Sequence, residues 1–251
     1  MLNRIVHLFI FIASTIVVAL SNESWQAFEL VRLENNANAC YSMCQDNSGL
    51  IWIGTNQGLY NFDGFNIHRA YSPGAKENTH VYCIINADSL LYLGTDAGVL
   101  VYNTKTDRSR SLNVKFPADV RALLMENSTL WIGSLNGLYK FDTKTKRISQ
   151  VAKGIAHKAV YALEMAADGS VFVGTYNGLS RKRPGSDSFE RVAIGQRGGG
   201  RNFFVNSLVA DDSDDCLWVG TEGALYVYDI YSGGIGEVTS MSGNSIKSLA
   251  I

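Results

Sequence analysis

Two positions that recur along the chain carry side chains suited to binding a polar ligand. The first recurs at intervals of about 40 to 45 residues and holds Tyr41, Tyr82, Arg121, Tyr161, Asn206 and Lys247. The second lies in a short turn further along each interval and holds Asn56, Asp96, Asn136, Tyr176 and Glu222. Aromatic faces beside amide, guanidinium and carboxylate groups suit a sugar, because its C–H face stacks on rings while its hydroxyl groups need directed partners. We therefore predict ligand binding by Tyr41, Tyr82, Arg121, Tyr161, Asn206, Asp96, Tyr176 and Glu222. The alternative is that the tyrosines only pack between neighbouring repeats.

Catalysis is less favoured than binding. Glycoside hydrolysis needs two carboxyl groups at a fixed separation, one of them with a raised pKa. Asp96, Asp119 and Glu222 instead fall on different repeats, and the sequence shows no pairing among them. Three histidines have no carboxylate or Ser partner in the repeat frame and are expected on the surface or in loops: His68, His80 and His157. We predict no catalytic residue, and a carbohydrate-active enzyme is the weaker alternative.

The cysteines predict neither a metal site nor a cofactor site. The chain has four cysteines, without a CxxC pair or a Cys/His spacing typical of zinc ligands. Cys40 and Cys44 lie four residues apart on one predicted strand, about 13 Å, so they cannot form a disulfide with each other. A disulfide that involves Cys83 or Cys216 stays open.

A glycine-rich insert lengthens the interval between the fourth and fifth repeats, from Ile194 to Phe204. It lacks the Lys-Ser/Thr pair of a phosphate-binding loop, so we expect a flexible loop at the rim. Its arginines, Arg197 and Arg201, could contact an acidic glycan.

Composition excludes two further classes of protein. The chain has 251 residues, of which 46% are apolar and 18% charged, which is too apolar for a disordered protein. The formal net charge is −1, and the basic residues form no stripe that would bind nucleic-acid phosphates.

The first 21 residues are predicted to be a secretory signal peptide. Arg4 precedes an apolar run from Ile5 to Leu20, and small residues flank a cleavage point after Ser21. The run is shorter than the ~20 residues that a membrane-spanning helix needs. We therefore expect a signal peptide at 1–21 and an exported, periplasmic domain at 22–251.

A repeated pattern predicts the fold. An aromatic or apolar stretch followed by Gly and Thr or Ser begins at Trp52, Tyr92, Trp131, Phe172 and Trp218. Each copy is preceded by a β-branched strand with a small third residue, which we expect to crowd a central axis, and is followed by a hairpin turn with glycine. A polar fourth strand, such as Phe65 to Tyr71 or Phe189 to Ile194, completes the repeat. Four strands in about 40 to 45 residues predict an all-β protein, a β-propeller of four-stranded blades. In the fifth copy Ala224 replaces the turn glycine, so that hairpin is the least regular.

The stretch from Asp46 to Gly64 closely resembles the repeat of the two-component regulator propeller family. The resemblance implies the periplasmic sensor region of a hybrid two-component histidine kinase, with a seven-bladed ring followed by a β-sandwich, a membrane helix and kinase domains. It also implies an oligosaccharide ligand and a homodimer whose arrangement the ligand stabilises. A structural or protein-docking propeller without a small ligand is the alternative. The turn from Asp46 to Trp52 also resembles the structural Asp-box turn of sialidase-like propellers.

The number of repeats predicts an incomplete ring. Five full repeats are followed by the start of a sixth at Ile246 to Leu249, and an extra strand at Ala27 to Leu33 is expected as the outer strand of the last blade. We expect the membrane helix and the kinase domains to lie in regions that follow this chain. An open ring also leaves one blade face unpaired, which predicts aggregation.

Overall fold

The computed structural model describes residues 37–70, 79–112, 119–194 and 203–251. The predicted signal peptide, the predicted strand at Ala27 to Leu33 and residues 195–202 of the insert lie outside these ranges. None of the described segments forms a helix that could span a bilayer.

The described chain forms five four-stranded antiparallel sheets, each with its strands in sequence order. The first sheet contains β1 (Cys40–Gln45), β2 (Ile51–Thr55), β3 (Gly58–Phe62) and β4 (Ile67–Arg69). The second contains β5 (Val81–Ala87), β6 (Leu90–Thr95), β7 (Gly98–Asn103) and β8 (Arg108–Ser111). The third contains β9 (Val120–Glu126), β10 (Thr129–Ser134), β11 (Gly137–Asp142) and β12 (Ile148–Gln150). The fourth contains β13 (Val160–Met165), β14 (Val171–Thr175), β15 (Gly178–Lys182) and β16 (Glu190–Val192). The fifth contains β17 (Val205–Asp211), β18 (Cys216–Thr221), β19 (Leu225–Asp229) and β20 (Ile235–Glu237), and a short 3₁₀ helix, η1 (Thr239–Met241), follows.

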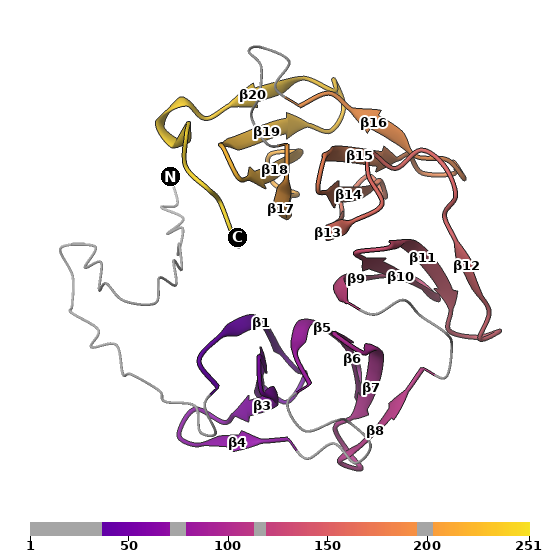
Figure 1. Cartoon of the computed structure of the whole chain (residues 1–251), viewed down its shortest axis with the longest axis vertical. Helices are drawn as coiled ribbons and strands as arrows, with labels where there is room; N and C mark the ends of the chain where they lie inside the picture. Colours follow the sequence, from indigo (N-terminus) through magenta and orange to yellow (C-terminus); the bar gives the residue numbers. More distant parts are fainter. Residues whose placement is uncertain (1–36, 71–78, 113–118, 195–202) are drawn as a thin grey trace.

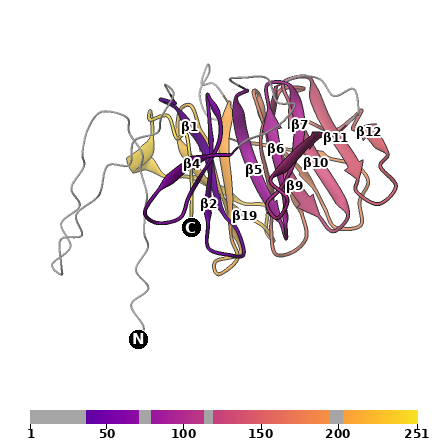
Figure 2. The ribbon, with the colours of Figure 1, turned by 90° about the horizontal axis from the view of Figure 1, so that it is seen from below.

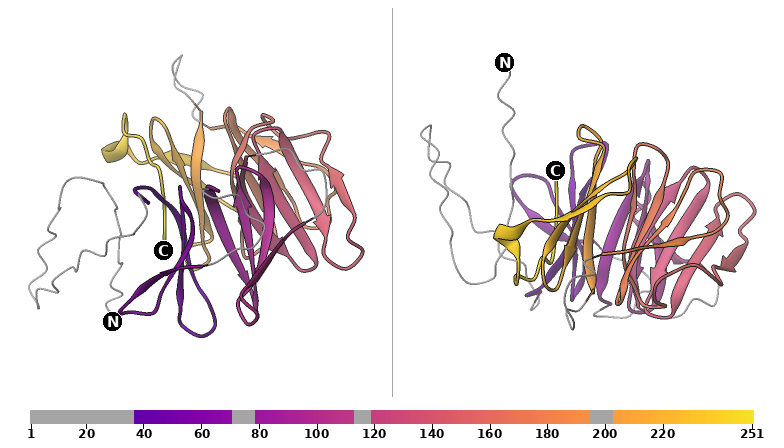
Figure 3. Two further views of the ribbon diagram at one scale, coloured as in Figure 1. Left: turned by 60° about the horizontal axis from the view of Figure 1, so that its bottom comes forward. Right: turned by 90° about the horizontal axis from the view of Figure 1, so that it is seen from above.

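The sheets are the blades of a β-propeller, which confirms the predicted fold class. Figure 1 shows them arranged around a common axis, with β1, β5, β9, β13 and β17 innermost. The inner strands contact one another in sequence order, from β1 to β5 and on to β17. Figures 2 and 3 show the strands running between the two faces of the ring. The outer strands are shorter than the sequence predicted, because only three or four residues of each pair with the third strand.

A repeated contact joins each blade to the next. Each second strand has a glycine opposite a small residue of the inner strand, as in the pair of Gly94 with Cys83. A Cβ on Gly94 would lie 2.9 Å from the backbone oxygen of Val120, the first residue of the next inner strand. The glycine therefore permits the close backbone approach that the sequence predicted. The expectation for the small third residue was wrong: it lies against this glycine and leaves room for the next blade, instead of crowding the axis.

A buried hydroxyl closes the hairpin between the second and third strands of every blade. In the fourth blade, Thr175 Oγ1 donates to the carbonyl of Gly178 at 2.7 Å, and the same bond recurs in the other four blades. The glycine has φ of +115° there, a conformation that other residues rarely adopt. In the fifth blade, Thr221 donates to Ala224 instead, Ala224 has no positive φ, and β19 begins one residue later. The fifth hairpin thus differs in form, as its missing glycine predicted.

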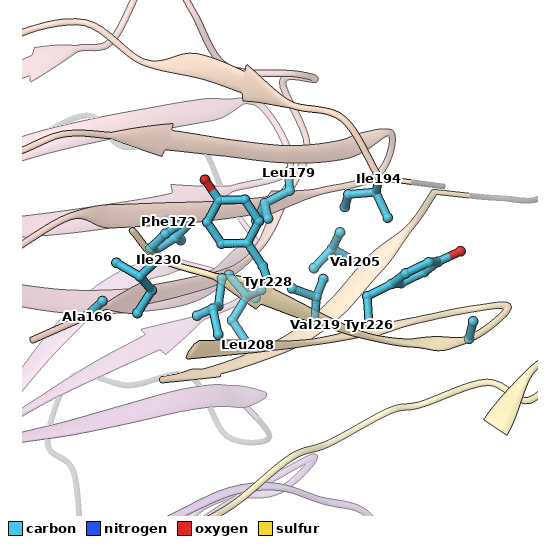
Figure 4. Packing of buried hydrophobic residues seen from close by; sticks show 13 residues of the cluster. Ala166, Phe172, Leu179, Ile194, Val205, Leu208, Val219, Tyr226, Tyr228 and Ile230 are labelled. Carbon is cyan, nitrogen blue, oxygen red and sulfur yellow. The ribbon is translucent and has the colours of Figure 1, made fainter. Parts of the chain in front are cut away.

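Apolar residues of neighbouring blades form the core. Figure 4 shows the interface of the fourth and fifth blades, where Phe172 and Leu179 pack with Val205, Val219 and Tyr228. Phe172 and Tyr228 meet edge to face, with ring centroids 5.6 Å apart. Similar clusters lie between the other neighbouring blades.

The first blade has one face without a neighbour in the described structure. Met43 of β1 is 52% exposed, whereas the residues at the same position of the next inner strands are buried, including Ile84 at 8% and Leu123 at 6%. This agrees with the expected unpaired blade face. The expected aggregation stays a prediction.

The predicted sixth inner strand is absent from the described structure. Residues 246–249 form no strand, because they have no antiparallel partner among the described residues. Ile246 nevertheless takes the place of the valine of a next blade: its backbone N–H donates to Thr221 O at 2.8 Å, and its Cγ2 lies against Gly220.

Candidate functional site

Each inner strand carries a β-bulge at the same point, near its first residue. The pairing with the second strand shifts register there, so one residue of the inner strand is left out of the ladder. The residues left out are Tyr41, Tyr82, Arg121, Tyr161 and Asn206. Bulges redirect side chains and are common beside functional sites. The variable position that the sequence singled out is therefore also a distinct backbone position in all five blades.

The bulges and the turns between the second and third strands share one face of the ring, which we call the bulge face. In every blade the first residue of the turn donates its backbone N–H to the residue directly before the inner strand. Asp96 donates to His80 at 3.3 Å, and Tyr176 donates to Ala159 at 2.9 Å. The loops therefore meet as predicted. In the third blade the turn begins at Leu135, so the predicted Asn136 is its second residue.

Three aromatic residues of the first two blades contact one another on the bulge face. Tyr41 and Tyr82 have ring centroids 5.2 Å apart, and both rings lie near the ring of His80. The Tyr82 hydroxyl and His80 Nδ1 are 3.3 Å apart. Tyr41 is 44% exposed, which leaves its ring accessible.

Charged residues of the second and third blades continue this group. The Arg121 guanidinium lies over the Tyr82 ring, 3.7 Å from its centroid, and donates to Asp119 at 3.3 Å. Burial raises the pKa of Tyr82, against the opposing effect of Arg121. Asp96 Oδ1 and Arg121 Nε are buried and have no hydrogen-bond partner in the described structure. We call Tyr41, His80, Tyr82, Asp96, Asp119 and Arg121 the polar arc.

An aromatic cluster lies on the bulge face of the fourth and fifth blades. The Phe204 ring is 4.3 Å from Tyr161 and 5.6 Å from Tyr176, measured between centroids. The His157 ring centroid lies 5.4 Å from that of Tyr176. Tyr176 is 52% exposed. These rings offer an apolar surface to a ligand that approaches the bulge face.

A polar group in the fifth blade is satisfied within the chain. Glu222 accepts from Ser245 Oγ at 2.7 Å and from Asn206 Nδ2 at 3.3 Å, and it pairs with Lys247. Hydrogen bonds from Lys247, which has the larger effect, and from Ser245 hold the pKa of Glu222 below its ordinary value. Both carboxylate oxygens of Glu222 already have partners, whereas Asp96 Oδ1 has none in the described structure.

The structure thus brings Tyr41 together with Tyr82 and Arg121, and Asn206 together with Glu222. Tyr161 and Tyr176 meet through Phe204, which the sequence reasoning did not select. His80, Asp119 and Phe204 all lie directly before an inner strand, and this shared position is the signal that would have found them. Their binding role, like that of the predicted residues, stays a prediction.

The opposite face of the ring carries structural turns. Asp46 accepts from the indole N–H of Trp52 at 2.8 Å and from the backbone N–H of Ser48 at 2.9 Å and Leu50 at 3.1 Å. Although burial acts to raise it, the pKa of Asp46 is held below its ordinary value by a hydrogen bond from the Ser48 hydroxyl together with the bonds from Trp52, Ser48 N–H and Leu50 N–H. In the third blade, Glu126 accepts from the indole of Trp131 in the same manner. The Asp46 turn therefore fixes the blade, as the Asp-box resemblance implied.

The described residues contain no group of three or more His, Cys, Asp or Glu side chains that could hold a metal ion. All four cysteines are unpaired in the structure. Burial raises the pKa of the Cys83 thiol to about 12, so this thiol stays protonated beside Gly94.

Residues 35–57 match the family described as two component regulator propeller. No curated protein is significantly similar in sequence to this chain.

Solved structures extend the similarity over most of the chain. The extracellular domain of the B. thetaiotaomicron protein BT4673, described as part of a one-component or hybrid two-component system, is 37% identical with a TM-score of 0.84. The match covers 91% of this chain and 31% of that domain. This chain therefore spans about a third of the length of that relative.

Two further structures share the fold alone. The extracellular domain of the B. thetaiotaomicron protein BT3049, described as a hybrid two-component system, is 19% identical with a TM-score of 0.68, over 83% of this chain and 30% of that one. Virginiamycin B lyase of Staphylococcus aureus is 15% identical with a TM-score of 0.67, over 82% of this chain and 72% of that one.

Proposed function

The chain belongs to the two-component regulator propeller family, and on that premise we propose that its blades are a ligand-binding segment of an extracytoplasmic sensor. The ligand class we propose is an oligosaccharide. The 37% identity to an extracellular domain of a signalling protein supports the sensor role. The chemistry of the bulge face supports the ligand class.

One observation carries this proposal: every blade repeats the same scaffold, whereas the bulge residue is tyrosine in three blades, arginine in one and asparagine in one. The buried glycine, valine and threonine positions vary little, whereas the bulge residues include tyrosine, arginine and asparagine. Ligand sites are commonly built on variable loops of a rigid scaffold. The exposed rings of Tyr41 and Tyr176 offer stacking surfaces, and the polar arc offers directed donors and acceptors.

Location and partners belong to the same proposal. We place the segment in the periplasm, with a kinase region of the same system as the receiver of the signal. The ligand would stabilise one of two arrangements of a homodimer, which requires that its affinity for the two arrangements differs.

The test is a binding screen of the chain against oligosaccharides, read by thermal shift and confirmed by calorimetry. A ligand at 100 times its Kd stabilises the folded state by about 2.7 kcal/mol, which raises Tm by roughly 5 °C for a chain of this size. No shift and no binding heat across a broad panel would contradict ligand sensing and favour a protein-docking propeller. Release of a shortened product would indicate an enzyme.

A further inference from the structure

The polar arc carries an excess of negative charge. It contains two carboxylates, Asp96 and Asp119, and one guanidinium, that of Arg121. Arg121 is already paired with Asp119 at 3.3 Å. Asp96 makes no ion pair in the described structure, and its Oδ1 is buried without a hydrogen-bond partner. One negative charge is therefore left over beside the aromatic rings.

Among the described residues this excess is confined to the polar arc, because the other cations of the bulge face lie elsewhere: Arg69 and Arg191 of the outer strands donate to the turn carbonyls of Gln57 and Asn177 at 3.0 Å. Glu222 and Lys247 pair with each other in the fifth blade, so together they add no net charge. Lys158 is exposed on the loop of the fourth blade that carries His157.

The guanidinium of Arg121 is also poorly placed to accept a second carboxylate. One of its faces lies over Tyr82, and its Nη2 donates to Asp119. Its Nε is buried. An Arg that recognises an acidic group usually presents two parallel N–H donors, and here the Nε donor is withdrawn from solvent.

We infer that the polar arc selects uncharged over acidic oligosaccharides, with Asp96 as the residue that determines this specificity. This inference rests on the proposed function, and it narrows the ligand class. A uronate or sulfate group held over the polar arc would meet the uncompensated charge of Asp96. At about 8 Å and an effective dielectric constant of about 30, one such charge weakens binding about tenfold.

The experiment compares two tetrasaccharide sets by calorimetry on the full chain at about 0.01 M salt, where the Debye length of about 30 Å leaves the charge of Asp96 largely unscreened. The uncharged set contains cellotetraose, xylotetraose, maltotetraose and β-1,4-galactotetraose. The acidic set contains tetragalacturonic acid and a chondroitin sulfate tetrasaccharide. The chain is expected to bind a member of the uncharged set at least tenfold more tightly than any acidic one.

The variant Asp96→Asn removes the charge while keeping the shape of the side chain. In this variant the preference for the uncharged set over the acidic set should fall about tenfold, whatever the change in affinity for the uncharged ligand. Asp142→Asn makes the same change in charge on the opposite face and should leave the preference unaltered. The Tm of each variant shows whether it is folded.

The outcomes separate this inference from the proposed function. Tighter binding of an acidic tetrasaccharide, or an unchanged preference in folded Asp96→Asn, overturns the inference and leaves oligosaccharide sensing in place. Binding of neither set overturns both. A preference for an uncharged ligand that Asp96→Asn reduces supports both.

Discussion

The interfaces between blades and the bulge face are built from the same strands, yet they behave in opposite ways. At the interfaces each blade repeats one solution: a glycine, a small residue opposite it and a β-branched residue from the next blade. On the bulge face the bulge residue is tyrosine in three blades, arginine in the third and asparagine in the fifth, and the turn residues vary as well. A side chain that does not pack in an interface between blades can differ between blades without loss of stability. Substitutions at the interfaces should therefore reduce stability, and substitutions on the bulge face should reduce binding.

The largest effect on stability is expected at Arg181, which is 2% exposed and ties the fourth blade to the fifth. It donates to Asp168 at 2.7 Å, to Ser170 at 3.0 Å and to the carbonyl of Ile230 at 2.8 Å. Arg181→Met would leave Asp168 without its cation, so we expect a loss of about 3 to 5 kcal/mol in the free energy of unfolding. Urea denaturation measures it. A loss below about 1 kcal/mol would show that this network does not hold the blades together.

A smaller loss is expected when a methyl group is added at the glycine of an interface. In Gly94→Ala, the new Cβ would lie 2.9 Å from the backbone oxygen of Val120 and against Cys83 Sγ, so one of the blades must move. We expect a loss of about 1 to 3 kcal/mol, measured by urea denaturation. Gly236→Ala in the outer strand β20 is the matched control, because its Cβ would meet no atom within 4 Å. Equal losses for the two variants would contradict the interface argument.

The interface between the fourth and fifth blades contains a carboxyl group that should make the free energy of unfolding depend on pH. Glu164 occupies a position on β13 where the other inner strands have Cys44, Ile85, Leu124 and Val209. Burial raises its pKa from 4.5 to about 7. The folded state therefore binds the proton more tightly than the unfolded state, and stability is lost as pH rises from about 4.5 to about 7.

Between pH 5 and pH 8 this loss should amount to about 2 kcal/mol in urea denaturation. Glu164→Gln should remove most of the dependence and be more stable than the wild type at pH 8. The carboxyl groups with lowered pKa, including Asp46 and Asp142, titrate below this window and act in the opposite direction. A flat profile for the wild type would contradict burial of Glu164.

The sequence was sufficient to predict the fold because the same pattern of residues recurs in five repeats. The glycine and the hydroxyl residue after it recur in all five repeats and the turn glycine in four, and each marks a contact that the structure contains. The role of the small third residue was misjudged, because spacing shows that a position must be small and does not show which neighbour it meets.

The candidate site was predictable in part. The bulge positions stood out because they vary where everything around them repeats. His80 and Phe204 were not selected, and Asp119 was considered only as a catalytic carboxylate, because these residues precede the strands, where the repeat fixes no residue type. The pairing of Arg121 with Tyr82, and the isolation of Asp96, depend on how neighbouring blades meet in space. Periodicity along one chain does not carry that information.

The smallest effect on stability, and the clearest separation of the two regions, is expected at Tyr41. Its ring contacts Tyr82 and His80 on the bulge face but is 44% exposed, so Tyr41→Ala should change the free energy of unfolding by no more than about 1 kcal/mol. Loss of one stacking surface should weaken binding of an uncharged tetrasaccharide about tenfold in calorimetry. Tyr231→Ala, at a tyrosine 69% exposed between β19 and β20 on the opposite face, should change neither quantity. If Tyr41→Ala lowered stability as much as Gly94→Ala while binding stayed intact, Tyr41 would be a packing residue. That result would contradict ligand binding at the bulge face.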